Sequence, residues 1–283
     1  MNWLHAILLG IVEGITEFLP VSSTGHLNVV EKLFGYEIDS VGMTAFTAII
    51  QVGAIIAAIV FFWKDIVTIV AAWAKGLGNA EARKDPNYKL GWGVILGSIP
   101  VAVVGLVFQG PIETTMRNLW VIIAALLAWS VVMWLADRYA AKRPAEKLRG
   151  MADVTITDSL VIGLFQALAP VFPGFSRSGA TISAALFRGF DRVTATRLSF
   201  FLGIPALVAA GGLQAVENYD QVASTVGWGQ TLIATAVSFV VAYASIAWLL
   251  KYVSKNSFTL FIVYRIVLAV VLAALVLTKV VSA

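Results

Sequence analysis

The chain has 283 residues, of which 59% are hydrophobic and only 13% are charged, about half the charged fraction of a typical soluble domain. This composition excludes a soluble domain with an ordinary polar surface, and the net charge of +4 does not suggest a nucleic-acid partner. The absence of cysteine excludes disulfides and thiolate metal sites. From the high hydrophobic and low charged fractions we expect an integral membrane protein.

Two apolar regions with an internal break each precede three continuous apolar stretches. The first region, residues 2–34, is broken at Pro20, and the second, residues 158–189, is broken near Pro170, Pro173 and Gly174. The continuous stretches are roughly 43–63, 91–109, 118–136, 197–216, 229–250 and 257–279. Each is close to the roughly 20 residues that a helix needs to cross the hydrocarbon. No removable signal peptide is expected, because the N-terminus lacks a charged leader and a small-residue cleavage site.

The basic residues indicate the orientation, because Lys and Arg collect in cytoplasmic loops. Fifteen of them lie in four stretches, 64–90, 137–157, 188–197 and 251–255, whereas the other side holds only Lys32, Arg117 and Lys279. The four stretches share one side only if both broken regions enter and leave by the same membrane face. We therefore predict an all-α protein with six transmembrane helices, two re-entrant helical hairpins and both termini on the outer side.

The number of membrane crossings predicts two inverted-topology repeats within a single membrane domain, 1–283. Each half crosses the membrane three times, and an odd number of crossings inverts the second half relative to the first. The first repeat is 1–136 with hairpin 2–34, and the second is 158–283 with hairpin 158–189. Residues 137–157 form a cytoplasmic linker. Gly10 and Pro20 are spaced like Gly163 and Pro173. Such repeats place a binding site near the midplane, where the breaks meet.

The first broken region contains two acids, Glu13 and Glu17, within an apolar segment. Charge inside a membrane is costly and indicates function. The two residues are four apart and share a helix face, so their carboxylates repel unless a proton or a divalent metal lies between them. The alternative is an exposed amphipathic helix with solvated glutamates.

After Pro20 the chain supplies residues that can start a second half-helix. Ser22, Ser23 and Thr24 are N-cap residues, and a helix N-terminus binds phosphate readily. His26 would lie in the first turn as a neutral imidazole that can accept a proton. Its alternative is an ordinary capping or core histidine.

The second break repeats the arrangement with a cation. Arg177 lies in the turn, and its planar fork suits a phosphate group, unless it is a surface arginine whose head reaches the lipid headgroups. The turn also supplies hydroxyl groups and glycines that admit close approach: Gly174, Ser176, Ser178, Gly179 and Thr181. Arg265, inside the last span, either pairs with a glutamate, helps to hold a diphosphate or anchors a helix end. Together the breaks predict a phosphoryl-transfer site, where catalysis is mostly positioning and charge neutralisation.

Two motifs resemble the signatures of a known family. Residues 13–26 read EGITEFLPVSSTGH, and residues 173–181 read PGFSRSGAT. They are similar to the first and second signatures of the undecaprenyl-diphosphatase, or bacitracin-resistance, family. The similarity runs through the whole chain, including FIVYR at 261–265.

The resemblance implies an inner-membrane enzyme that removes one phosphate from undecaprenyl diphosphate, giving the monophosphate carrier used in peptidoglycan synthesis, assisted by Mg2+ or Ca2+. Glu13 and Glu17 would be metal-binding or acid–base residues. Ser23 is the candidate nucleophile, with His26 beside it as base or alternative nucleophile. Arg177 would act in catalysis as well as binding. The diphosphate would be bound by Ser22, Thr24, Gly25, Ser176, Arg177, Ser178, Gly179 and Thr181.

Two other functions fit the same pattern. A lipid-phosphate transporter or flippase could use the same site, because broken helices in inverted repeats are a transporter architecture. A membrane scaffold without catalysis would tolerate loss of Glu17 or Arg177. The sequence leaves open the prenyl chain length, the metal, a homodimeric state, and whether Ser23 or His26 attacks phosphorus.

Overall fold

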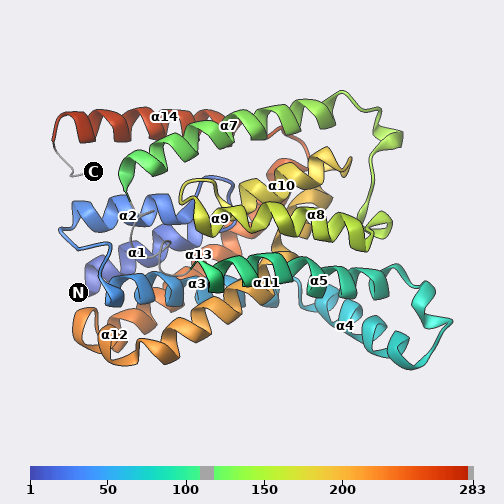
Figure 1. Ribbon diagram of the computed structural model, residues 1–283, viewed down its shortest axis with the longest axis horizontal. Helices are drawn as coiled ribbons and strands as arrows, with labels where there is room; N and C mark the ends of the chain where they lie inside the picture. The colour runs from blue at the N-terminus through green and yellow to red at the C-terminus, as the bar shows by residue number, and fades with distance from the viewer. Residues whose placement is uncertain (109–117, 280–283) are drawn as a thin grey trace.

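The computed structural model describes residues 1–108 and 118–279. Arg117, one of the three basic residues predicted on the outer side, lies outside the described residues. Within these two ranges the secondary structure is helical, apart from an isolated bridge between Arg149 and Phe190. The long helices run roughly along one axis, and the N-terminus lies at the same end of the molecule as the last turn of α14 (Thr259–Leu277) (Figure 1).

Six helices in the described residues are long and apolar enough to cross a membrane. They are α3 (Val41–Phe61), α5 (Pro86–Val107), α7 (Leu119–Ala141), α11 (Arg192–Glu217), α13 (Trp228–Val253) and α14 (Thr259–Leu277). Each coincides with one of the six predicted stretches. Many large apolar side chains on these helices point outward, among them Ile99 on α5, Val131 on α7 and Val270 on α14. This is the surface expected of helices that contact lipid.

Both interrupted regions fold as a helix, a break and a second helix that packs back against the first. In the first region α1 (Trp3–Thr16) is followed by α2 (Ser23–Leu33). In the second, α8 (Ile156–Gln166) and the short α9 (Leu168–Val171) are followed by α10 (Arg177–Phe187). Re-entry through one membrane face, the inversion of the two halves and the division into repeats stay predictions.

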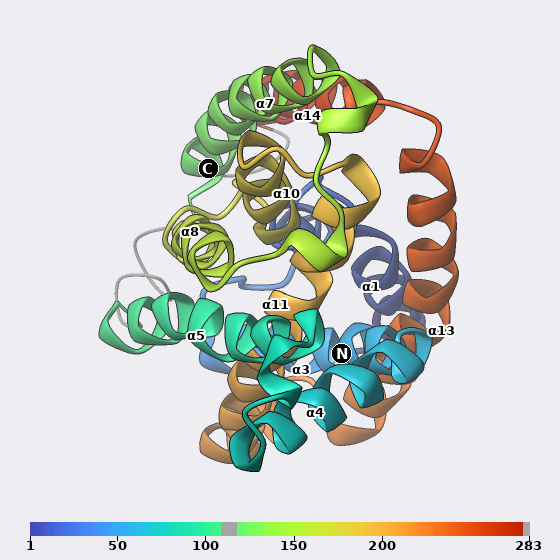
Figure 2. The ribbon, with the colours of Figure 1, turned by 90° about the vertical axis from the view of Figure 1, so that its right-hand side faces the viewer.

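The broken regions lie inside the bundle. Figure 2, which looks along the long axis, shows α1 and α10 enclosed between α7 and α14 on one side and α3, α5 and α13 on the other. Nearly every residue of α10 is buried, and the main apolar cluster joins it to Phe18, Trp129, Phe200 and Ile246 from four other segments. The polar residues of the breaks therefore sit in an apolar interior, where unpaired polar groups are costly.

Gly10 and Gly163 occupy corresponding places in the packing. A Cβ on Gly10 would approach the backbone of Ala234 on α13, and a Cβ on Gly163 would overlap the backbone of Gly97 on α5. Glycine is required at both positions because two helix backbones approach closely. Each broken region thus packs on the middle spanning helix of the other half, α1 on α13 and α8 on α5.

Ion pairs gather three of the four basic stretches at one end of the bundle, called here the basic end. Arg192 binds Asp137 at 2.7 Å, Arg197 binds Asp65 at 2.7 Å, and Asp158 binds both Arg149 and Arg188. The N-terminal ammonium group lies at the opposite end, 3.3 Å from the carbonyl oxygen of Val226. The structure therefore separates the N-terminus from the basic loops.

Asp158 shows how the linker is attached to α8. Burial would raise the pKa of this carboxyl, but hydrogen bonds from Arg149, Thr155 and Arg188 outweigh burial and hold the pKa below its usual range. Thr155 and Asp158 also form a capping box that starts α8. The linker is therefore fixed to the second broken region by charge as well as by backbone.

The remaining helices lie at the two ends. Four are at the basic end: α4 (Trp63–Gly78), η1 (Ala82–Lys84), η3 (Ala145–Lys147) and η4 (Met151–Asp153). The helix α12 (Tyr219–Thr225) lies at the other end, where it packs on α3. The sequence predicted none of these as separate helices, because each is short or too polar to resemble a span.

Candidate active site

The two breaks begin their second helices with the same turn. Ser22 and Ser176 are the N-caps of α2 and α10, and both have positive φ, at 75° and 68°. Each serine hydroxyl oxygen accepts a hydrogen bond from the backbone N–H of the glycine three residues later, Gly25 at 3.3 Å and Gly179 at 3.1 Å. Positive φ is costly for serine, so the surrounding structure holds both caps in place.

One carboxylate joins the two breaks. Nη2 of Arg177 lies 3.1 Å from Oε1 of Glu17, and the hydroxyl of Ser23 donates to Oε2 of Glu17 at 2.7 Å. The side chains of Glu17 and Arg177 are 4% and 11% exposed, so the ion pair is largely withdrawn from solvent. The prediction that the acidic break and the arginine-bearing break meet is confirmed.

Glu13 lies behind this pair and is fully buried. Within the described residues neither of its carboxyl oxygens has a hydrogen-bond donor, and its carboxyl group interacts directly with that of Glu17. Two carboxyl groups in contact need a proton or a cation between them. The described residues contain no cluster of three or more His, Asp or Glu side chains suited to a metal, so an ion would have two carboxylate ligands at most and would need water to complete its shell.

His26 turns away from Ser23. Its Nδ1 lies 2.7 Å from the carbonyl oxygen of Ser22, so Nδ1 carries the hydrogen, and its Nε2 accepts from the hydroxyl of Tyr264 at 2.6 Å. The rings of His26 and Tyr264 also stack. The structure thus places the carboxylate of Glu17, rather than the imidazole of His26, in contact with the Ser23 hydroxyl.

Comparison with known proteins decides the family. The family model described as Bacitracin resistance protein BacA matches residues 6–271. The chain belongs to the BacA family. It is similar over its whole length, and over the whole length of each relative, to the undecaprenyl-diphosphatase of Cutibacterium acnes, with 64% identity, and to undecaprenyl-diphosphatase 3 of Frankia casuarinae, with 53%. Undecaprenyl-diphosphatase 1 of Streptomyces avermitilis is 50% identical over 98% of each chain.

The family and the six apolar helices together identify a multi-pass membrane protein. The resemblance inferred from the two motifs is confirmed. Both motifs, 13–26 and 173–181, fall within the residues that match the family. They are also the two breaks that the structure brings together at Glu17 and Arg177.

Most of the hydroxyls predicted to bind diphosphate make hydrogen bonds within the protein, and their binding of diphosphate stays a prediction. Ser22 and Ser176 cap helices, as described above. Ser178 donates to the carbonyl oxygen of Leu19 at 2.9 Å, which ties the second break to the first. Thr181 is fully buried and donates to Ser199 at 2.7 Å. The prediction did not allow for this, because residue type alone does not show which hydroxyls the turn itself uses.

The other predicted binding groups lie at the helix starts. Thr24 is half-buried in the first turn of α2. The N–H groups of Gly25 and Gly179 are engaged by the capping serines. Among the predicted residues, Ser23 and Arg177 are therefore the side chains that the structure directs to the carboxylate of Glu17.

Arg265 joins the backbones of both breaks. It is fully buried, and it donates to the carbonyl oxygens of Pro20 at 3.4 Å, Gly174 at 2.8 Å and Leu126 at 3.3 Å. Arg265 also donates to the hydroxyl oxygen of Ser130 at 3.2 Å, and these four dipoles offset part of the cost of burying its charge. Of the roles considered for Arg265, pairing with a glutamate is not what the structure shows. It holds the two breaks at a fixed distance.

Sequence reasoning missed Gly203. A Cβ at this position on α11 would overlap the guanidinium group of Arg177, whose Nη1 donates to the carbonyl oxygen of Ser199 at 3.1 Å on the same helix. Gly203 therefore leaves the room in which Arg177 lies. No signal in the sequence marks it, since a glycine inside an apolar helix usually indicates close packing alone.

Proposed function

We propose that the chain hydrolyses undecaprenyl diphosphate to undecaprenyl phosphate and inorganic phosphate, and so returns a lipid carrier to peptidoglycan synthesis. One observation supports this most directly: Glu17 binds the hydroxyl of Ser23 and the guanidinium group of Arg177 at once. A nucleophile, a base and a phosphate-binding cation are thus in contact. The names of the relatives support the substrate, and bacitracin resistance is the role named for the family.

In the proposed reaction Glu17 accepts the proton of Ser23 as the serine oxygen attacks the terminal phosphorus. The bond from that phosphorus to the bridging oxygen breaks, and undecaprenyl phosphate leaves. Water then attacks the phosphoserine and releases inorganic phosphate. Arg177 and the helix N-termini at Ser23 and Arg177 stabilise the charge on the transferred group. His26, held by Ser22 and Tyr264, positions the first turn of α2.

We further propose that Glu13, together with Glu17, holds a divalent cation, Mg2+ or Ca2+. The two oxygens of the buried Glu13 support this, because they have no hydrogen-bond donor within the described residues and hard cations prefer carboxylate oxygens. When bound, the ion would supply positive charge that neutralises the diphosphate. Glu17 keeps its contacts with Ser23 and Arg177 through one lone pair of each oxygen.

The proposed setting is the inner membrane, with the basic end in the cytoplasm, both termini outside and the breaks forming two re-entrant hairpins of inverted repeats. Three features support this: the separation of the N-terminus from the basic loops, the matched caps at Ser22 and Ser176, and the reciprocal packing at Gly10 and Gly163. The proposed lipid partner is the prenyl diphosphate itself.

The experiment is phosphate release from undecaprenyl diphosphate by the purified protein in detergent. We expect turnover by the wild type, strong inhibition by a chelator with recovery on adding Mg2+ or Ca2+, and nearly complete loss in Arg177→Ala. A transporter without hydrolytic activity would release no phosphate. Full activity in Arg177→Ala would contradict the proposed site, whereas full activity in chelator would contradict only the metal.

A further inference from the structure

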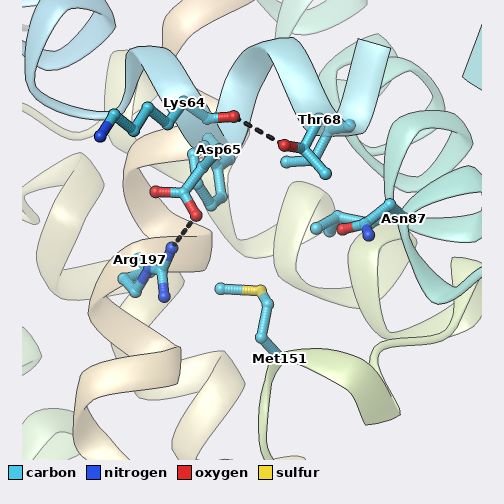
Figure 3. Close-up of a pocket in the computed structure, with 9 residues that line it drawn as sticks. Lys64, Asp65, Thr68, Asn87, Met151 and Arg197 are labelled. Atoms are coloured by element: carbon cyan, nitrogen blue, oxygen red, sulfur yellow. Dashed lines mark hydrogen bonds and ion pairs between the residues drawn. The ribbon is translucent and has the colours of Figure 1, made fainter. Parts of the chain in front are cut away.

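A second polar site lies at the basic end, away from the paired breaks. It is a cavity of about 290 Å³ between α4, α5, η4 and α11. Its polar lining comes from Lys64, Asp65, Thr68, Asn87 and Arg197, as Figure 3 shows. Its apolar lining includes Leu90, Met151 and Phe201. None of these residues contributes to the chemistry proposed above.

The cavity has an excess of one positive charge. Arg197 binds Asp65 at 2.7 Å, which neutralises that pair. Lys64 has no ion-pair partner in the part of the chain that the structure describes, and it is exposed. The Nε of Arg197 is buried and lacks a hydrogen-bond acceptor within the same residues. The Lys64 ammonium group is therefore available to an anion, and the partly exposed guanidinium group of Arg197 adds positive charge beside it.

The position of α4 places the cavity at the level of the lipid headgroups. The spanning helix α3 has 21 residues, enough to cross the hydrocarbon, and ends at Phe61. Lys64 and Asp65 are in the first turn of α4, immediately beyond that end, where lipid headgroups lie. On the face of α4 turned away from the cavity, about half-exposed apolar side chains recur at helical spacing: Trp63, Val67, Val70 and Leu77. The cavity therefore lies on the more polar face of an amphipathic helix.

We propose that this cavity binds the headgroup of an anionic phospholipid from the surrounding bilayer. The phosphodiester of such a lipid has a single negative charge, which matches the excess charge of the cavity, whereas inorganic phosphate near neutral pH has between one and two. Lys64 and Arg197 bind the phosphate, and the chains extend into the hydrocarbon that α3 crosses. In Figure 3 the Lys64 ammonium group points away from Thr68, so its flexible stem turns inward on binding. Basic pockets on the cytoplasmic side of other membrane proteins bind lipid headgroups.

The bound lipid would be separate from the diphosphate substrate. A series of aromatic rings separates the cavity from Glu17: Phe201 contacts Phe62, Phe62 contacts Phe200, and Phe200 contacts Phe18, with centroids 5.3, 5.8 and 4.9 Å apart. This apolar layer gives a polar headgroup no passage from one site to the other. The lipid is therefore a structural ligand of the basic end.

The test uses the full-length protein in a nonionic detergent, titrated with short-chain phosphatidylglycerol, with bound lipid counted by native mass spectrometry. The variant Lys64→Gln/Arg197→Gln removes both cations of the cavity. The variant Lys75→Gln/Lys89→Gln removes the same charge from exposed positions outside the cavity. We expect the first variant to weaken binding about tenfold and the second less than about twofold, since each basic residue near a headgroup contributes modestly. Lys64→Gln alone, at an exposed position, keeps the test valid if the double variant unfolds.

Two further arms decide the source of the anion. Phosphatidylcholine, which has a phosphodiester but no net charge, should bind at least about tenfold more weakly than phosphatidylglycerol. Inorganic phosphate at millimolar concentration should leave the lipid bound. Equal losses in the two double variants, equal binding of the two lipids, or displacement by inorganic phosphate would each overturn the proposal.

Discussion

The two breaks share one turn and differ in the residue that follows the cap. Ser22 and Ser176 adopt the same unusual backbone conformation and make the same hydrogen bond to a glycine. The next residue is Ser23 in the first break and Arg177 in the second. Both of these side chains reach Glu17, at 2.7 Å and 3.1 Å. Corresponding positions therefore supply a hydroxyl from one side and a cation from the other.

The difference in charge explains why the breaks must meet. The first break contributes two carboxyl groups, Glu13 and Glu17, and the second contributes one guanidinium group. A buried ion without a partner is costly, so Arg177 and Glu17 each make the other tolerable in an apolar interior. One carboxyl group is left over, which is the one whose oxygens lack donors within the described residues. The imbalance favours a bound cation or proton beside Glu13.

The largest effect should come from removing the hydroxyl that follows the first cap. We expect Ser23→Ala to lower kcat by about 10⁴-fold or more, because removing a nucleophile abolishes the covalent step. Ser178→Ala, in the second break, removes a hydroxyl that binds the carbonyl oxygen of Leu19 and the hydroxyl of Ser176 but not Glu17, and we expect a change of less than about tenfold. Phosphate release measures both. Equal losses would show that the two hydroxyls act alike, against the assignment of Ser23.

The next effect concerns the carboxylate that the two breaks share. Glu17→Gln keeps the shape of the side chain but cannot accept the proton of Ser23, so we expect kcat to fall by about 10³-fold. Glu37→Gln, at an exposed position, serves as the control. Because the amide still accepts a hydrogen bond, the protein should remain folded by circular dichroism. A fall of less than tenfold would assign the base to another group.

The spans and the two breaks could be predicted from the sequence, because they depend on composition and on the order of residues along the chain. The six spans follow from runs of apolar residues, and the two breaks follow from proline and hydroxyl-rich turns. The meeting of Glu17 and Arg177 could be expected because a buried charge needs a partner.

What could not be predicted is which partner each polar group takes. Ser176, Ser178 and Thr181 are of the right type for phosphate, and each has a partner within the protein: the N–H of Gly179, the carbonyl oxygen of Leu19 in the first break and the hydroxyl of Ser199 on α11. His26 was expected beside Ser23, yet its ring binds Ser22 and Tyr264, the latter 238 residues away. Such choices depend on helix packing, which pattern and spacing do not encode residue by residue.

A smaller loss of activity is expected when Arg177 is retained but its guanidinium group is displaced. Gly203→Ala places a methyl group where the guanidinium group lies, and the flexible end of Arg177 moves. We expect kcat/KM to fall about 30-fold, since displacement by about 1 Å can be that costly, while the thermal midpoint changes little. Gly212→Ala on the same helix meets no atom within 4 Å and is the matched control. Unchanged kcat/KM in Gly203→Ala would mean that the position of Arg177 is not critical.

The smallest effects test whether the two turns are equivalent. Ser22→Ala and Ser176→Ala each remove a cap hydrogen bond, and we expect each to cost about 1 kcal/mol of stability. Ser22→Gly and Ser176→Gly should cost only a few tenths, since glycine caps a helix nearly as well and adopts positive φ freely. Thermal unfolding of the purified variants in one detergent measures all four.

The pattern of the four values is more informative than any one of them. In the alanine variants the hydrogen bond is lost and the positive φ remains, whereas in the glycine variants the bond is lost and the backbone cost is relieved as well. If the breaks are the same turn, the difference between alanine and glycine should agree for Ser22 and Ser176 within the error of measurement. A difference at Ser176 alone would mean that the fit of Arg177 against Glu17, and not the cap, holds the second break in its conformation.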